Sequence, residues 1–268
     1  GRVVEGLEPP YDAPWGSRAL NALRLRNWLR QAERRTIRVE GRLRTHDPAR
    51  PEGLEASGNV VSDRFQLAVE AHTMHVRAAV RVRIAQAVLL RVLAGRWDAP
   101  SAHHRALALL AGPADRGVGA ELAFDLDRMA RTIATHRDVA TFVEADAEGA
   151  LAWLHAHNVV SAAFQGFLDA HGYRGFRELD LEATPWADDP ASLVAGLQVR
   201  VAHADRPAPV RERVPVGWLP ARLAPWLRRS LALREVTRDL LARAHHQLRH
   251  AVHHLGRELD REGRLPHA

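Results

Sequence analysis

The fold class of this chain is indicated by residues 221–262, which have the sequence ARLAPWLRRSLALREVTRDLLARAHHQLRHAVHHLGRELDRE. Steps of alternately four and three positions from Leu227 follow one face of a single helix. The predicted seam on that face consists of Leu227, Leu231, Arg234, Arg238, Leu241, His245, Leu248, Val252, Leu255 and Leu259. The stretch therefore predicts one long amphipathic helix.

Helical spacing extends over almost all of the preceding residues. Apolar side chains recur three and four positions apart, and no strand-like alternation bounded by turns lasts more than a few residues. The expected helices span residues 17–43, 63–93, 101–111, 117–133, 139–143, 147–171 and 191–201. Asp63 and Ser101 are expected to cap the N-termini of their helices, and Gly95 to end the second helix. We predict an all-α fold, an irregular bundle of long and short helices that forms a single domain over residues 1–268.

Composition excludes several kinds of chemistry. The chain has 268 residues, of which 46% are hydrophobic and 26% charged, as is typical of a folded globular protein. It has no cysteine, which excludes thiolate nucleophiles, iron–sulfur clusters and cysteine-type zinc sites. It also has no lysine, which excludes Schiff-base catalysis. Because the sequence shows no cysteine, signal peptide or membrane-spanning segment, we expect a soluble cytoplasmic protein.

The charge distribution does not predict a nucleic-acid partner. The chain has 38 basic and 32 acidic residues, a formal net charge of +6. Nucleic-acid binding would require arginines gathered on one face or in a run. Here they are interleaved with carboxylates, as in residues 125–138. Binding of nucleic acid by an arginine-rich surface is therefore the weakest of the functions considered for this chain. Salt-dependent binding to DNA would test it.

Two arginines and a histidine interrupt the apolar seam. Charged side chains on such a stripe cost free energy unless they meet carboxylates or face a polar cleft. Arg234 and Arg238 therefore leave two interpretations. Either this part of the helix lies at the surface and the arginines extend into solvent, or they form an anion or phosphate site, for which arginine geometry is suited.

A loop predicted over residues 171–190 is the second candidate region, and it begins with the sequence HGYRGFRELD. Glycines on both sides of Arg174 indicate a backbone that approaches another segment closely. Glu178 or Asp180 is expected to pair with Arg234 or Arg174, and the loop is expected to pack on the last helix. The same residues also fit a simple interhelical turn with a satisfied ion pair.

The histidines do not predict a metal site. His246, His250 and His253 share a helical face, and His72 with His75 could form another pair. Zinc sites usually add a carboxylate and an outer hydrogen-bond partner, and no HExxH motif is present. We expect the three-histidine face to be solvated. We therefore expect the chain to hold no metal. The chain also has no GxxxxGK[ST], GxSxG or GxGxxG motif, so we expect it to hold no cofactor.

The loop and the last helix together resemble the rifampin phosphotransferases and related phosphoenolpyruvate synthase-like proteins. Residues 167–190 resemble the family stretch FLxxYGHRGxxExDLxxPRWxEDP, residues 232–238 its GLREYPK helix, and residues 255–265 its LGxxLxxxGxL ending. The earlier residues match only loosely, for instance at His75. Two positions depart from the pattern: Arg238 stands in place of a lysine, and Tyr173 in place of a histidine.

The resemblance implies an enzyme with three kinds of domain: an ATP-grasp domain, a central helical domain that binds the acceptor, and a swivelling domain whose histidine carries the phosphoryl group. Because this chain begins at Gly1 and shows no motif of the other two domains, we expect it to be the helical acceptor-binding domain of a longer phosphotransferase. ATP and magnesium would bind to the other domains, which are the expected partners together with a drug or other small-molecule acceptor. The isolated chain is expected not to consume ATP.

The resemblance also implies roles for individual residues. The candidate catalytic residues, at the phosphoryl-transfer end of the acceptor pocket, are Arg234, Glu235 and Arg238. The candidate substrate-binding residues are Arg174, Glu178 and His75. The alternative function is a noncatalytic helical scaffold that links the ATP-grasp and phosphohistidine domains. A scaffold is expected to have its seam arginines fully paired, whereas a binding domain is expected to open an apolar cavity onto them.

Overall fold

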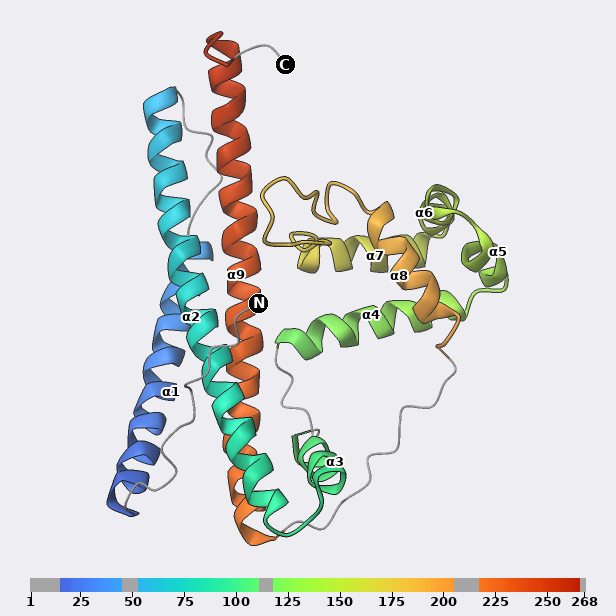
Figure 1. The fold of residues 1–268 in the computed structure, drawn as a ribbon. Coiled ribbons are helices and arrows are strands. Elements are labelled where there is room, and N and C mark those ends of the chain that lie inside the picture. Colours follow the sequence, from blue (N-terminus) through green and yellow to red (C-terminus); the bar gives the residue numbers. More distant parts are fainter. Residues whose placement is uncertain (1–14, 45–52, 111–117, 205–216, 266–268) are drawn as a thin grey trace, which may run out of the picture.

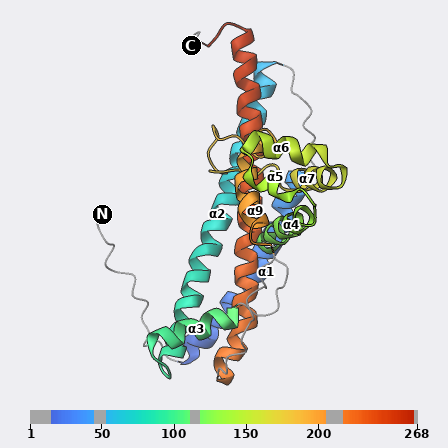
Figure 2. The same ribbon diagram turned by 90° about the vertical axis from the view of Figure 1, so that its right-hand side faces the viewer.

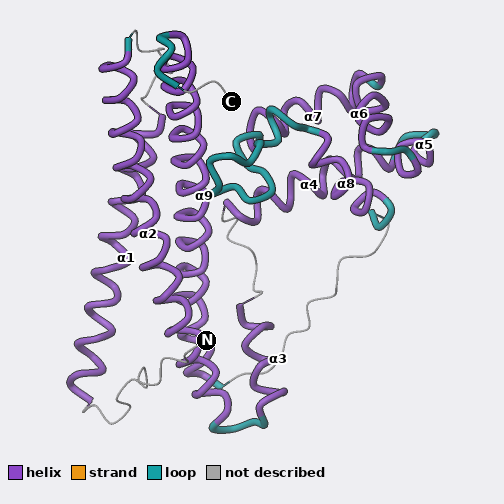
Figure 3. Tube along the Cα trace, turned by 45° about the horizontal axis from the view of Figure 1, so that its top comes forward, coloured by secondary structure: helices purple, strands orange, loops and turns teal. Residues whose placement is uncertain are grey.

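A computed structural model describes residues 15–44, 53–110, 118–204 and 217–265 of the chain. Every regular element within these residues is a helix (Figure 3). The helices are α1 (Trp15–Arg44), α2 (Leu54–Ala94), α3 (Ala99–Leu110), α4 (Val118–Ala134), α5 (Val139–Glu144), α6 (Ala147–Ala156), α7 (Asn158–His171), α8 (Ala191–Val201) and α9 (Trp218–Arg261). None of them combines the length and the apolarity that a membrane span requires. The predicted all-α class is confirmed.

The long helices α1, α2 and α9 lie side by side and form a rod (Figure 1). The face that α2 buries consists of residues three and four positions apart, among them Leu67, Ala71, Met74, Ala78, Val82, Ala85 and Leu89. Small alanine side chains on this face allow the helix backbones to approach closely. Each fully buried leucine contributes about 1.5–3 kcal/mol to stability. The apolar side chains whose spacing predicted the helices are therefore the ones that pack the rod together.

Helices α4 to α8 form a lobe that projects from one side of the rod, and Figure 2 views the molecule with this lobe toward the reader. The lobe has an apolar core of its own, whose fully buried members include Ile133, Phe142, Leu154, Phe164 and Leu197. A separate cluster around Leu67 and Leu241 joins α2 to α9 in the rod. The loop of residues 172–190 lies between the two parts and approaches α9 (Figure 1). A single domain over the whole chain remains a prediction.

The N-termini of α2 and α3 differ from the predicted caps. α2 starts directly after Gly53, whose φ of 87° is the left-handed conformation that glycine adopts readily. Asp63 therefore lies inside α2 instead of capping it, and its carboxylate pairs with Arg42 of α1 at 3.1 Å. In α3 the capping carboxylate is Asp98, which accepts a hydrogen bond from the backbone N–H of Ser101 at 2.9 Å. Ser101 is thus a donor to the cap and not the cap itself.

The helix predicted over residues 147–171 is in fact two helices, α6 and α7. His157, between them, has φ −110° and ψ 99°, an extended backbone that ends α6. Its ring nitrogen Nδ1 lies 2.7 Å from the carbonyl oxygen of Trp153, in the last turn of α6. No glycine or proline marks this junction. Apolar spacing alone therefore predicted one continuous helix.

Candidate functional site

The loop of residues 172–190 has a tightly constrained backbone. Hydrogen bonds of 2.7 and 2.9 Å between backbone atoms join its two ends. A Cβ on Gly172 would lie 2.4 Å from the carbonyl oxygen of Leu168, and one on Gly175 would lie 2.9 Å from that of Thr184. These positions admit only glycine without a shift of the backbone. The close approach predicted for these glycines is confirmed.

A buried carboxylate on α9 holds the loop in place. Asp239 is only 3% exposed, and its Oδ1 accepts hydrogen bonds from Arg174 Nη2 at 2.5 Å and from the Tyr173 hydroxyl. Arg243 Nε lies 2.9 Å from the other oxygen, Oδ2. Burial, and then the hydrogen bond to Asp239, raises the pKa of Tyr173, so its hydroxyl keeps the proton that it donates. A buried charge is tolerated when it is paired in this way. The predicted packing of the loop on the last helix is confirmed.

The face that α9 buries differs from the predicted seam. Leu227, Leu241 and Leu248 are buried as expected. The buried residues between them are Ser230, Leu233, Thr237, Asp239, Leu240, Ala242 and Ala244. Arg238 is instead 57% exposed at its side chain, and Arg234 is partly exposed. The exposure of these two arginines agrees with the first interpretation of the sequence, in which this part of the helix lies at the surface. The buried residues do not follow a single stripe because α2 and the loop cover different sides of α9.

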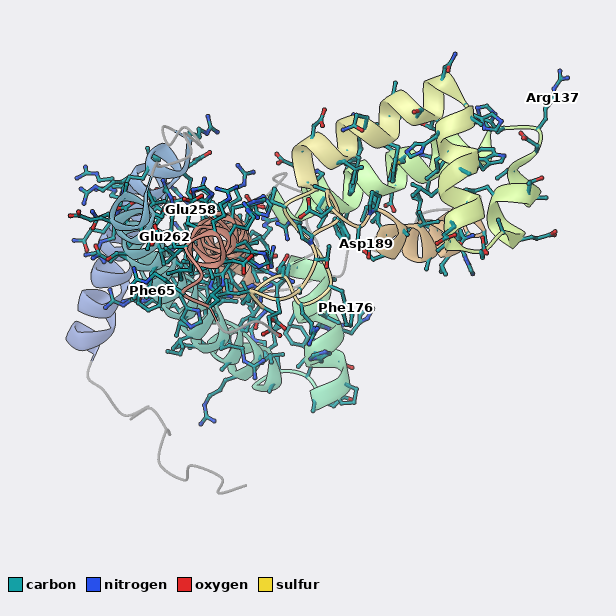
Figure 4. All side chains as sticks on the ribbon, turned by 90° about the horizontal axis from the view of Figure 1, so that it is seen from above. Phe65, Arg137, Phe176, Asp189, Glu258 and Glu262 are labelled. Carbon is teal, nitrogen blue, oxygen red and sulfur yellow. The ribbon has the colours of Figure 1, made fainter. Side chains whose placement is uncertain are left out.

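An open cavity of about 740 Å³ lies where the loop, α2, α4 and α9 meet. Four of the six predicted site residues line it, namely His75 of α2, Arg174 and Glu178 of the loop, and Arg238 of α9. Its other walls are Leu122, Gly175, Phe176, Arg177, Leu179, Asp180, Trp186 and Leu241. In the view from above in Figure 4, Phe176 lies on the loop between the rod and the lobe. The cavity thus joins an apolar surface to three guanidinium groups.

Glu178 links two of these guanidinium groups at the cavity wall. Its Oε2 accepts from Arg174 Nη1 and its Oε1 from Arg238 Nε, both at 3.2 Å. The predicted pairing of Glu178 with Arg174 is confirmed, whereas Asp180 pairs with Arg177 at 3.3 Å. Because more than half of its side chain remains exposed, Arg238 is accessible to an anion that enters the cavity.

Arg234 and Glu235 lie on α9 but are not among the residues that line the cavity. Arg234 donates from Nε and Nη2 to Glu235 Oε1, at 2.9 and 2.5 Å. The predicted alternative in which Glu178 or Asp180 holds Arg234 is therefore wrong. Glu235, which is adjacent to Arg234 in the sequence, is the carboxylate that pairs with its guanidinium group, and no carboxylate of the loop does so.

His75 is a polar group at the edge of the cavity that can act as a hydrogen-bond acceptor. Its Nδ1 lies 3.4 Å from Thr237 Oγ1, and the Thr237 hydroxyl donates to the carbonyl oxygen of Arg234 at 2.9 Å. The hydroxyl can then only accept from His75, which assigns the proton to Nδ1 and leaves Nε2 as the acceptor. Burial, with a further contribution from the charge of Arg238, lowers the pKa of His75 and favours the neutral ring.

Two more side chains of α9 contact the loop, and the sequence analysis missed both contacts. Arg249 is buried and donates to the carbonyl oxygens of Asp180 at 2.6 Å and Leu181 at 3.3 Å. The ring of His246 packs against Tyr173 with centroids 6.3 Å apart, and burial lowers the pKa of His246 to about 4. The predicted solvated histidine face is wrong for His246 because the loop covers it.

Comparison with known families identifies the family of the chain. The family model of the rifampicin phosphotransferase fourth domain matches residues 75–258. The chain belongs to this family. The match to the rifampicin phosphotransferase fourth domain begins at His75 and includes every residue that lines the cavity. Neither the curated proteins nor the solved structures include a significant match to the chain.

Proposed function

We propose that the cavity binds the phosphoryl acceptor of a rifampicin phosphotransferase-like enzyme. The observation that carries this proposal is the cavity itself, in which apolar walls adjoin Arg174, Arg177 and Arg238. Apolar walls can bind a hydrophobic acceptor, and guanidinium groups can stabilise the negative charge of a phosphoryl group while it is transferred. A domain that only linked its neighbours would not need this combination.

The size of the cavity favours a drug-sized acceptor. Its volume of about 740 Å³ falls within the roughly 300–1,000 Å³ of typical ligand sites and exceeds what a small acid such as pyruvate would fill. Phe176 is 83% exposed, so an apolar ligand that covered its ring would remove apolar surface from water. Rifampicin, the compound in the name of the family, is the first acceptor to test.

Arg238 is the proposed catalytic residue, because it is an accessible cation in the cavity wall. Preorganised charge at the transferred phosphoryl group lowers the barrier without a covalent step by the protein. Arg234 and Glu235 precede Arg238 by about one helical turn, and we assign them to the same phosphoryl-transfer end of α9. Their ion pair would hold that end of the site in place.

The proposed substrate-binding residues are Arg174, Glu178 and His75. Arg174 and Glu178 form the wall against which the acceptor would lie. His75 would accept a hydrogen bond at Nε2 from the hydroxyl group that is phosphorylated, and a neutral imidazole can take its proton as transfer proceeds. ATP and magnesium would bind to other domains of a cytoplasmic enzyme, and the phosphoryl group would arrive on the histidine of a swivelling domain.

Rifampicin binding to this chain tests the proposal directly. We expect isothermal titration calorimetry to show one site, and we expect Phe176→Ala to weaken it by on the order of 10-fold through the loss of a large apolar contact. Phe65→Ala is the matched control, because Phe65 is also an exposed phenylalanine but lies on α2 outside the cavity. Absence of rifampicin binding, or an equal loss in both variants, would contradict the proposal for this acceptor.

The scaffold function remains the second candidate, and two observations favour it. Arg234 and Arg238 are both paired with carboxylates, as is expected of a scaffold. An exposed apolar stripe runs along α2 through Phe65, Val69, Val76, Val80 and Ile84. Stripes of this kind often contact another protein surface. Replacing Val80 with aspartate in the complete enzyme would impair domain assembly if the stripe is a scaffold contact, and would leave rifampicin binding to this chain unchanged.

A further inference from the structure

Three metal-ligating side chains gather at the outer end of the lobe. His136 follows α4, Asp138 is the residue before α5, and His157 is the junction between α6 and α7. Figure 4 shows Arg137, which stands between His136 and Asp138 in the sequence, at the end of the lobe that is distant from α9. None of the three lines the cavity described above. The cluster is therefore independent of the proposed acceptor site.

The ligand atoms of these side chains lie close enough to share one ion. One atom from each of the three residues lies within 4.8 Å of the other two. His157 Nε2 is 3.2 Å from Asp138 Oδ2, and His136 Nδ1 is 3.9 Å from Asp138 Oδ1. Ligands of one tetrahedral zinc ion lie about 3.3 Å apart, given bond lengths of roughly 2.0–2.2 Å. Only small side-chain adjustments are needed to reach that geometry.

The hydrogen bonds around the cluster orient His157 for metal binding. His157 Nδ1 lies 2.7 Å from the backbone carbonyl oxygen of Trp153, which can only accept, so Nδ1 carries the proton. Nε2 therefore faces the carboxylate of Asp138, 3.2 Å from Oδ2, and is the ring nitrogen that is available to a metal ion. An N–H donated to a carbonyl behind a free Nε2 is the usual arrangement of a zinc-bound histidine.

Trp153 supports the remaining ligands. Its indole Nε1 donates to Asp138 Oδ2 at 3.0 Å, which fixes the orientation of the carboxylate. The buried indole ring also packs against His157, with centroids 4.1 Å apart, and against the edge of His136 at 5.5 Å. All three candidate ligands are therefore positioned by one buried side chain.

We propose that His136, Asp138 and His157 form a structural site for a divalent transition metal, with zinc as the favoured ion and water as the fourth ligand. Two imidazoles and one carboxylate suit zinc better than magnesium or calcium, which prefer oxygen ligands alone. The ligands come from two separate junctions, α4–α5 and α6–α7. A bound ion would tie these junctions together and stabilise the outer end of the lobe.

Metal titration of the chain after treatment with a chelator tests the site. We expect one zinc ion to bind by calorimetry, bound Co²⁺ to give the visible absorption of a tetrahedral site, and zinc to raise the melting temperature. His136→Ala and Asp138→Asn should each weaken zinc affinity by about 100-fold or more, since loss of even an outer-shell partner costs roughly 10–100-fold. His136 lies outside the helices, so its replacement should leave the fold intact even if His157→Ala unfolds α6.

A second histidine pair provides the matched control. His246 and His250 lie 3.1 Å apart at Nε2 on α9 and could take up metal nonspecifically. We expect the double variant with alanine at both positions to retain the zinc site, the Co²⁺ absorption and the thermal shift. The proposal is overturned if wild-type chain binds no zinc, or if binding is lost in this double variant and kept in His136→Ala.

Discussion

At the scale of single residues, the docking of the loop onto α9 depends on Asp239. Its carboxylate meets Arg174, Arg243 and the Tyr173 hydroxyl in a buried position. The loop in turn supplies part of the cavity wall. Removing one carboxylate should therefore affect both the stability of the chain and the shape of the candidate site.

Asp239→Ala should lower the free energy of unfolding by about 3–5 kcal/mol, because it leaves the buried Arg174 without its closest partner. Urea denaturation of the chain measures this change. Asp127→Ala is the control, since Asp127 pairs with Arg200 at the surface and its loss should cost about 1 kcal/mol or less. Equal effects of the two substitutions would show that the Asp239 cluster contributes no more than an exposed pair.

Arg238→Ala should lower kcat of the complete enzyme by on the order of 100-fold, the scale of losing one preorganised charge contact. Its melting temperature should change little, because the side chain is largely exposed. Arg238→Lys should retain most activity, since it keeps the charge. Steady-state kinetics and thermal melting on the same preparations separate these effects, and full turnover by the alanine variant would end the catalytic assignment.

The stability of the chain should fall as the pH drops from about 6.5 to about 4. Burial lowers the pKa of His246 to about 4, so in this range the unfolded chain binds a proton that the folded chain excludes. The groups whose charges act on His246 are His250, Arg249 and Asp188, and the pKa of His250 is lowered as well. Melting temperatures across this pH range should vary less in His246→Gln, whereas replacement of the exposed His203 should not change the profile. An unaltered pH profile in His246→Gln would contradict the assignment.

At the scale of the elements, the long helices could be predicted and some of their boundaries could not. The ends of α2 and α9 fall within a few residues of glycine and proline signals, and their apolar spacing is dense enough to identify each helix. The division between α6 and α7 was missed because it depends on His157 and the turn around Trp153, and no residue type that breaks helices stands there. The spacing of apolar residues continues across this junction and therefore cannot predict the extended backbone at His157.

The candidate site was predictable only in part, for a related reason. The resemblance indicated four site residues that the structure brings to one cavity, namely His75, Arg174, Glu178 and Arg238. Asp239 was missed because a lone carboxylate in a helix rich in arginine resembles a solvated residue. Its role becomes visible only when a loop more than sixty residues earlier in the chain is known to cover it, as the separation of 65 positions between Arg174 and Asp239 shows.

The junction between α7 and the loop gives a prediction at this scale. Gly172→Ala should destabilise the chain, because its Cβ would lie 2.4 Å from a backbone oxygen that cannot move freely. Gly166→Ala, in the middle of α7 with open space around the new Cβ, should instead stabilise it by roughly 0.5–1 kcal/mol. Thermal melting of both variants provides the comparison. If Gly172→Ala also stabilised the chain, the loop would not need the tight backbone described here.

At the scale of the whole molecule, the chain combines a cavity that we propose binds the acceptor with the absence of any sequence motif that cradles a nucleotide. We expect the isolated chain to form no AMP from ATP in the presence of magnesium and rifampicin. A coupled assay for AMP checks this expectation, with the complete enzyme as the positive control. AMP formation by the isolated chain would show that phosphoryl transfer does not need the other domains.

The two separate cores also have a mechanical consequence. Within the described residues, the lobe meets α9 through α4 and through the loop, while α5 and α6 lie at its free end. The cavity lies where these two parts meet, so a ligand that filled it would contact α2 and α9 of the rod and α4 of the lobe at the same time. Such a ligand would resist rotation of the lobe against the rod.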